Sequence, residues 1–268
     1  MFVKKIVSIL FVFLFLARLD AALLSSLPDD EDILDAMQEH DVQGTMIISS
    51  EDNQIIYIFD AERAHTPLSP ASTFKIANSM IAIEEGVLKD QYEMIKWDGE
   101  KRFFDAWNQD QNLKSAFKSS CVWFYQELAK KIGGPKYEMY FELFDYGNQL
   151  LGDDITTFWL EGEGDLRITP LEQIDFLKGI YHRTLPISAR TYAILQDVML
   201  EEEGSDYQIY SKTGSATKNW IGHGWYVGYV TVKNETWFFV TNILIDGMKD
   251  LPKRKAVTIA VLNKKGII

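Results

Sequence analysis

Ser69-Pro70-Ala71-Ser72-Thr73-Phe74-Lys75 is the stretch that decides the fold of this 268-residue chain, and it opens a long apolar segment. A side-chain oxygen followed by proline is typical of a helix start, so we expect Ser69 to cap a helix. The helix is predicted to run to about Glu85, because Gly86 supplies a stop. Its apolar side chains point in nearly all directions, which is typical of a buried helix: Phe74, Ile76, Ala77, Met80, Ile81 and Ile83. Lys75 therefore needs a chemical reason to lie within it.

The spacing Ser-x-x-Lys places a hydroxyl and an amine on one face of a helix, which suits a nucleophile beside its base. It occurs three times, at Ser72/Lys75, Ser115/Lys118 and Ser215/Lys218. Context favours the first pair, because the free N–H groups of a helix start favour a developing oxyanion at Ser72. Burial should also lower the pKa of Lys75 and favour the neutral amine. The alternative is a structural lysine whose long stem reaches the surface.

A second short pattern, Lys212-Thr213-Gly214, lies at the end of a predicted strand. A glycine on a strand permits close approach of a substrate, while Lys212 and Thr213 offer a cation and a hydroxyl to an anionic ligand. As a lone tripeptide it would be an ordinary strand end. In this order, after a Ser-x-x-Lys helix, it matches the signature of penicillin-recognising serine enzymes.

The remaining hydrophobic pattern indicates strands at both ends of the chain and helices between them. The expected strands are residues 44–50, 54–59, 207–211, 225–232 and 236–245, with hairpin turns at 51–53 and 233–235. Residues 28–32 are expected to be a polar linker, and residues 250–264 a closing helix. The stretch from 88 to 199 is mostly helical, with loops at 133–135, 146–154 and 161–165. This order predicts an α+β fold, in which a mainly antiparallel sheet carries flanking helices and an inserted helical domain.

The chain resembles the class D (oxacillinase-type) serine β-lactamases over nearly its whole mature length. The family's segments occur in the family's order: Ser72-Thr73-Phe74-Lys75, Ser120-Cys121-Val122, Tyr146-Gly147-Asn148, Phe158-Trp159-Leu160-Glu161-Gly162 and Lys212-Thr213-Gly214. A class A enzyme would carry Ser-Asp-Asn and a Glu-x-x-Leu-Asn loop, and neither is present. Tyr146-x-Asn148 is similar to a class C pattern, but the other segments point to class D. In that family the Tyr-Gly-Asn segment is more structural than catalytic.

The resemblance implies a serine β-lactamase/penicillin-binding-protein-like fold and hydrolysis of penicillin-like antibiotics, hence resistance to them. Sheet residues would be about 22–80 and 205–268, and helical residues about 81–204. The catalytic residues implied are Ser72, Lys75, Ser120 and Lys212. The family's lysine reacts with carbon dioxide to form a carbamate, so no other cofactor and no metal is expected.

Further roles follow from the same resemblance. Trp159 is the position that holds the carbamate on Lys75, with apolar walls at Phe74, Val122 and Leu160. The backbone N–H groups of Ser72 and Ser215 would form the oxyanion hole. Thr213, Gly214 and Ser215 would bind substrate, and Arg254 would grip its carboxylate. Lys253 and Lys255 flank Arg254, so an alignment shifted by one residue is the alternative.

The first 21 residues have the pattern of a targeting segment. Lys4 and Lys5 precede an uncharged run from Ile6 to Ala17, which is too short for a bilayer span of about 20 residues. Residues 1–21 are therefore predicted to be a secretory signal that sends the protein to the bacterial periplasm. An uncleaved membrane anchor is the alternative.

Composition excludes several other classes. The formal net charge is −12, which repels nucleic acid and anionic lipid and favours a small-molecule substrate, with no stable insertion of the mature chain in a membrane. Cys121 is the single cysteine, so no internal disulfide forms, and we interpret it as a buried filler. The four histidines show no metal-ligand spacing, so a zinc hydrolase is not expected.

Two other functions fit the same fold. A penicillin sensor acylates and then stalls, but such receptors carry this domain behind several membrane spans. A D,D-peptidase acting on acyl-D-Ala-D-Ala would have extra domains and no need of the Trp159 environment. The preferred β-lactams, the oligomeric state and the cleavage site are left open by the sequence.

Overall fold

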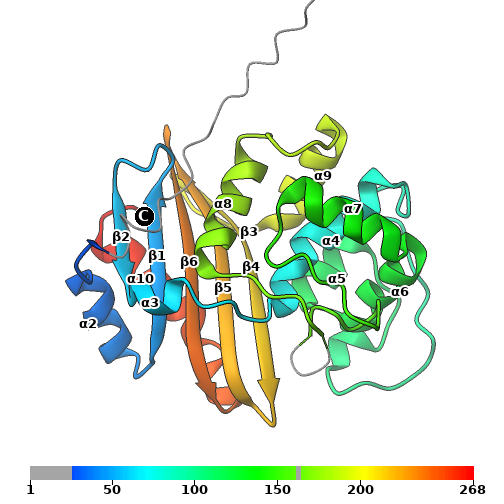
Figure 1. Ribbon diagram of the computed structural model, residues 1–268, viewed down its shortest axis with the longest axis horizontal. Coiled ribbons are helices and arrows are strands. Elements are labelled where there is room, and N and C mark those ends of the chain that lie inside the picture. The colour runs from blue at the N-terminus through cyan, green and yellow to red at the C-terminus, as the bar shows by residue number, and fades with distance from the viewer. Residues whose placement is uncertain (1–25, 161–163) are drawn as a thin grey trace, which may run out of the picture.

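A computed structural model describes residues 26–160 and 164–268. Its centre is one antiparallel sheet in the order β2-β1-β6-β5-β4-β3 (Figure 1). The strands are β1 (Gly44–Ser50), β2 (Ile56–Phe59), β3 (Leu200–Glu203), β4 (Tyr207–Lys218), β5 (Ile221–Val232) and β6 (Glu235–Asp246). The sheet and its surrounding helices confirm the predicted α+β class. The predicted signal segment, residues 1–21, lies outside the described residues, as do Glu161 and Gly162.

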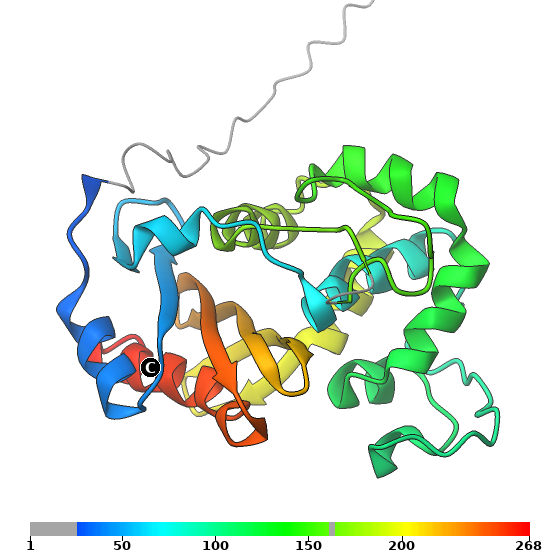
Figure 2. The same ribbon diagram turned by 60° about the horizontal axis from the view of Figure 1, so that its bottom comes forward.

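The helices form layers on both faces of the sheet. They are α2 (Glu31–Glu39), α3 (Ala61–Ala64), α4 (Lys75–Glu84), α5 (Leu113–Ser119), α6 (Val122–Ile132), α7 (Gly134–Phe144), α8 (Pro170–Tyr181), α9 (Ala189–Met199) and α10 (Lys253–Lys264). Helices α2 and α10 cover one face, while α8 and the green and cyan helices lie on the other (Figures 1 and 2). Short 3₁₀ turns are η1 (Ala71–Phe74), η2 (Asp105–Trp107) and η3 (Met248–Asp250). None of the described helices combines the length and the apolar character that a membrane span needs.

Strand β1 shows how the two layers share the sheet. Met46 and Ile48 pack in the core under α2 and α10, while Ile47 packs in the core on the opposite face. Successive strand side chains point to opposite faces, so a strand covered on both sides can carry consecutive apolar residues, as Met46, Ile47 and Ile48 do here. Strand β1 pairs with β6 from Gly44↔Ile243 to Ser50↔Trp237, which joins the first strands of the chain to the last.

Two local expectations were wrong, and one strand was not predicted. The predicted linker at 28–32 instead leads directly into α2, whose N-cap Asp30 accepts a hydrogen bond from Ile33 N at 3.1 Å. The predicted loop at 133–135 is a junction of one residue, because Gly133, at φ +84°, ends α6 and α7 begins at Gly134. Strand β3 was not predicted, since its acidic residues Glu201, Glu202 and Glu203 lack strand-like alternation.

The start of the helix that carries Lys75 also differs from expectation. Ser69 does not cap it, because Ser69 Oγ donates a hydrogen bond to Trp159 O at 3.1 Å. The chain instead passes through the 3₁₀ turn η1, whose N-cap is Pro70, and becomes α-helical at Lys75. A contact 90 residues away in sequence has replaced the local cap. The helix ends at Glu84, close to the predicted end, and Gly86 follows in the left-handed conformation at φ +67°.

Candidate active site

Ser72 and Lys75 meet at the junction between η1 and α4. Lys75 Nζ donates a hydrogen bond of 2.9 Å to Ser72 Oγ. The Lys75 side chain has no exposed surface, and it forms no ion pair with a carboxylate among the residues that the structure describes. Burial lowers the pKa of Lys75 to about 7. The amine is therefore partly neutral near pH 7, which a base beside a hydroxyl requires.

The backbone next to two of the predicted catalytic serines is unusual. Ala71, which precedes Ser72, has φ +47°, and Ser120 has φ +54° at the end of α5. Residues with a Cβ atom occupy this left-handed region at a conformational cost of about 1–3 kcal/mol. Such backbone is concentrated at functional sites. Here it lies beside one predicted catalytic serine and at the other.

Trp159 and Phe74 form the aromatic wall near Lys75. Their rings stack with centroids 5.7 Å apart, and both side chains have no exposed surface. Trp159 Nε1 is buried and donates to no partner among the described residues. A buried N–H without an acceptor is costly, so this atom indicates a ligand or modification that would satisfy it. Val122, at the start of α6, and Leu160 are half-buried.

Ser120 and Lys212 form a second hydroxyl–amine pair. Lys212 Nζ donates to Ser120 Oγ at 2.5 Å and to Thr213 O at 2.9 Å. Burial, with the positive charges of Lys75 and Arg254, holds the pKa of Lys212 well below its ordinary value. The repulsion from both cations indicates that the three basic groups lie in one electropositive site.

Arg254 is distinguished from its two basic neighbours by its surroundings. Lys253 pairs with Asp250 at 2.9 Å, and Lys255 pairs with Glu201 at 2.9 Å. Arg254 Nη1 donates to Gly214 O at 2.8 Å, and its guanidinium has no carboxylate partner among the described residues. Of these three cations, Arg254 is therefore the one free to bind a carboxylate beside β4.

Strand β4 places Thr213, Gly214 and Ser215 next to the turn that carries Ser72. A Cβ atom at Gly214 would lie 3.0 Å from Thr73 Cγ2 and 3.1 Å from Pro70 O. The missing side chain thus makes room for η1 as well as for a ligand. Thr213 and Ser215 are half-buried along the same strand.

Two residues that the sequence analysis did not assign hold this turn in place. Trp225 Nε1 donates to Ser69 O at 2.8 Å, and His223 Nε2 lies 3.0 Å from the same oxygen. Both come from β5, and Trp225 is paired in register with Gly214. The His-x-Trp spacing on a strand gave no indication of this role, since the acceptor lies 156 residues before Trp225.

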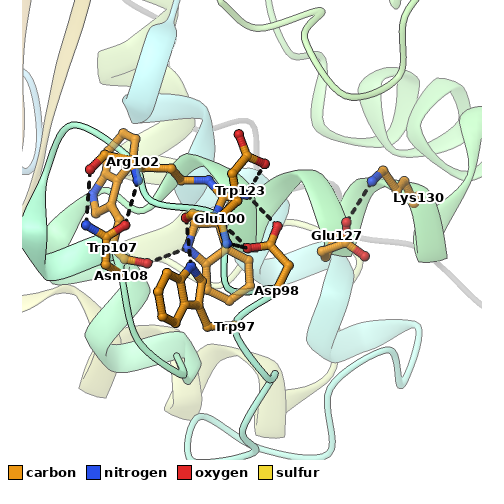
Figure 3. Close-up of polar contacts among 9 residues, drawn as sticks. All are labelled: Trp97, Asp98, Glu100, Arg102, Trp107, Asn108, Trp123, Glu127 and Lys130. Atoms are coloured by element: carbon orange, nitrogen blue, oxygen red, sulfur yellow. Dashed lines mark hydrogen bonds and ion pairs between the residues drawn. The ribbon is translucent and has the colours of Figure 1, made fainter.

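A cluster of aromatic and charged side chains stabilises the loop that precedes α5, and the sequence analysis did not predict it (Figure 3). Arg102 forms two hydrogen bonds with Asp98, at 2.8 and 2.7 Å, and its guanidinium lies 5.5 Å from the Trp123 ring centroid. Trp107 Nε1 donates to Ser119 O at 2.9 Å, and Trp123 Nε1 donates to Trp107 O at 2.8 Å. These contacts tie the loop to the left-handed turn at Ser120.

The other two Ser-x-x-Lys pairs have different roles. Ser115 Oγ accepts a hydrogen bond from Asn112 N and donates to Gln111 Oε1, as part of a capping box at the start of α5. Ser215 and Lys218 lie on β4, where residues three apart point to opposite faces. Cys121 is fully buried and burial raises its pKa to about 11, which suits the predicted filler and not a nucleophile.

Comparisons with known proteins agree with this geometry. The model of the penicillin-binding protein transpeptidase domain matches residues 39–263. β-Lactamase OXA-48 of Klebsiella pneumoniae is 40% identical over 230 residues, which covers 86% of each chain. Probable β-lactamase YbxI of Bacillus subtilis (strain 168) is 35% identical, over 85% of this chain and 83% of its own.

Solved structures give the same result. A class D β-lactamase from Nostoc has a TM-score of 0.84 and 39% identity, covering 87% of this chain and 98% of its own. FUS-1 (OXA-85), a class D β-lactamase from Fusobacterium nucleatum subsp. polymorphum, has a TM-score of 0.86 and 31% identity. The match covers 90% of this chain and 100% of the FUS-1 chain. The chain therefore belongs to the class D serine β-lactamases, the enzymes that hydrolyse β-lactam antibiotics.

Proposed function

We propose that Ser72 is the nucleophile of this hydrolysis and that its base is carried by Lys75. The observation that supports the assignment best is the 2.9 Å contact between Ser72 Oγ and the buried Lys75 Nζ. Ser72 Oγ forms a bond to the carbonyl carbon of the β-lactam ring and releases its proton to the base, and the C–N bond of the ring breaks. The product is an acyl-enzyme on Ser72.

Ser120 and Lys212 are assigned to the departing nitrogen. Ser120 Oγ, which accepts a hydrogen bond from Lys212 Nζ, passes a proton to that nitrogen. Ser120 regains a proton through Lys212 from the base at Lys75, so the proton lost by Ser72 ends on the leaving nitrogen and the base is free again. A water molecule then gives its hydroxyl to the acyl carbon and its proton, by way of the base at Lys75, to Ser72 Oγ.

Carbon dioxide on Lys75 Nζ, as a carbamate, fits the residues present. Burial lowers the pKa of Lys75 to about 7, which leaves neutral amine able to add carbon dioxide. Trp159 Nε1, which has no partner among the described residues, would hold the group, and Phe74, Val122 and Leu160 would supply apolar walls. Bound there, the carbamate would supply a carboxylate oxygen as the base beside Ser72.

The substrate is proposed to be held at its ring carbonyl and at its carboxylate. The N–H groups of Ser72 and Ser215 would stabilise the oxyanion of the ring carbonyl. Thr213 and Arg254 would bind the substrate carboxylate, since Arg254 is free of carboxylate partners in the described part of the chain. The site has no acidic residue assigned to it, although the chain as a whole carries −12.

The remaining sequence-based assignments belong to this proposal. Residues 1–21 would be removed as a secretory signal, so that the enzyme works in the bacterial periplasm, and N-terminal sequencing of the exported protein would test this. The sheet part would comprise about residues 22–80 and 205–268, and the helical part about residues 81–204. The pairing of β1 with β6 supports joining the two ends of the chain in one part.

The function is tested by hydrolysis of a chromogenic β-lactam, with Ser72→Ala as the control. The protein is degassed at mildly acidic pH and then assayed with and without added bicarbonate. Turnover that falls on degassing and returns with bicarbonate is expected if the base is a carbamate on Lys75. Turnover that does not depend on bicarbonate would rule out the carbamate as the base and leave the assignment of Ser72 as nucleophile intact. A single stoichiometric burst without further turnover would favour a penicillin sensor. Hydrolysis by Ser72→Ala would reject the nucleophile.

A further inference from the structure

A cavity of about 720 Å³ is lined by Lys212 and Thr213, and Ser72 is not among its lining residues. The other lining residues come from α5 and its N-cap, the end of α9, and strands β3 and β4. Its apolar lining comes from Phe117, Val198, Met199 and Leu200. The cavity therefore shares Lys212 and Thr213 with the proposed catalytic and carboxylate-binding residues, and it is large enough for a ring-sized substituent.

Of the charged groups that line this cavity, Lys114, Asp197 and Glu201 form ion pairs, and the buried Lys212 is hydrogen-bonded to Ser120. Lys114 pairs with Asp197 at 2.9 Å, and Glu201 pairs with Lys255. Lys118 is exposed, lines the same cavity, and forms no ion pair with any residue that the structure describes. It belongs to the second Ser-x-x-Lys pair, whose serine is occupied in capping α5. Lys118 therefore leaves the cavity with an unpaired cation at its edge.

The position of the cavity relative to Ser120 decides which part of a substrate reaches it. Under the proposed function, the ring nitrogen departs beside Ser120, which is bonded to Lys212. The carboxylate lies near Thr213 and Arg254. The portion of the fused ring that bears both the nitrogen and the carboxylate is thus placed beside Lys212 and Thr213, which also line the cavity.

We infer that this cavity is a subsite for the substituent on the leaving-nitrogen side of the β-lactam, and that it selects an apolar group ending in an anion. The inference rests on the proposed function of Ser72, Ser120 and Arg254. The apolar side chains Phe117, Met199 and Leu200 would pack against the body of the substituent, and Lys118 Nζ would attract its negative end. A cationic substituent would be disfavoured for the same reason.

The test uses cephalosporins with one common thienylacetamido side chain and three groups at the 3-position: methyl, carboxyphenylthiomethyl and pyridiniomethyl. In Lys118→Glu, kcat/KM for the carboxylated substrate should fall about fivefold relative to the methyl substrate, as expected for an exposed ion pair that is reversed. In the same variant, kcat/KM for the pyridinium substrate relative to the methyl substrate should rise. Leu200→Trp should lower kcat/KM for both bulky substrates and spare the methyl substrate.

Lys131→Glu is the matched control, because Lys131 is an exposed lysine of α6 that does not line the cavity. It makes the same change of net charge and should leave all three ratios unchanged. Equal ratios in wild type, Lys118→Glu and Lys131→Glu would overturn the subsite. Failure of the proposed function is separate, since wild type would then leave the methyl substrate intact or Ser72→Ala would still hydrolyse it.

Discussion

The indole N–H of Trp225 donates a 2.8 Å hydrogen bond to the carbonyl of Ser69, three residues before Ser72. Trp225 is paired with Gly214 across β5 and β4, so its side chain connects β5, the neighbour of the strand that carries Lys212, to the turn of the nucleophile. The left-handed Ala71 lies between that carbonyl and Ser72. The position of Ser72 is thus determined by the sheet as much as by the helix that follows it.

Trp225→Phe should therefore impair activity more than stability. His223 still reaches the Ser69 carbonyl, so loss of one hydrogen bond should lower the free energy of unfolding by about 1 kcal/mol. A small displacement of Ser72 should lower kcat about tenfold or more. Stopped-flow acylation and denaturant unfolding would measure the two effects. An unchanged acylation rate would show that the bond does not position the nucleophile.

Lys75→Met should abolish turnover and change how stability depends on pH. The pKa of Lys75 is lowered to about 7 in the folded protein, so between about pH 7 and its ordinary pKa the unfolded chain binds more protons. Wild-type stability should therefore rise with pH in that window, by at most about 1.4 kcal/mol per pH unit from this group.

The measurement is urea unfolding of degassed wild type and Lys75→Met from pH 7.5 to 9. The difference between the two slopes isolates Lys75 from Lys212, whose pKa is also lowered by burial. Parallel stability curves would mean that the amine is charged in the folded state, and the proposed carbon dioxide adduct would lose its support.

Trp159→Phe should weaken carbamate retention while keeping most of the packing. The phenyl ring can still pack against Phe74, but it lacks the N–H that has no partner among the described residues. Deacylation needs the base at Lys75, so it should slow by a factor of about 10² or more, and acyl-enzyme should accumulate. Mass spectrometry after a short reaction, and the bicarbonate concentration for half-maximal turnover, would measure this. Normal deacylation at low bicarbonate would contradict the role of Trp159.

Arg254→Ala should raise KM about tenfold or more with a smaller effect on kcat, because a charge-assisted contact to the substrate carboxylate is lost. Lys253→Ala and Lys255→Ala are the comparisons, since both lysines are engaged in ion pairs. They should leave KM within about twofold of wild type, because the amines of both lysines are already held by carboxylates. If Lys253→Ala or Lys255→Ala raised KM more than Arg254→Ala does, the contact to the substrate carboxylate would be assigned to that lysine instead.

Several elements were predictable because their signals are local. The apolar residues of α4, the hairpin of β5 and β6, and the glycine stop at Gly86 follow from side-chain periodicity and backbone preference. Strand β3 and helix α2 were missed because acidic side chains dominate both segments, and their stability comes from partners elsewhere in the chain. Lys265 pairs with Asp30 and Asp32 beside α2, for example.

The features of the candidate site also fall into those that local sequence predicts and those that tertiary packing sets. The sequence by itself determined the family, the α+β class and the identity of the candidate residues, because short segments such as Ser72-x-x-Lys75 and Lys212-Thr213-Gly214 carry that information in their order. Only the tertiary structure decided that Arg254, between two ion-paired lysines, has no carboxylate partner in the described part of the chain. It also decided that Trp159 Nε1 lacks an acceptor among the described residues, and that Ser69 donates to Trp159 O instead of capping a helix. Each of these depends on groups far apart in the chain, and the distance between such groups is set by packing and not by local spacing.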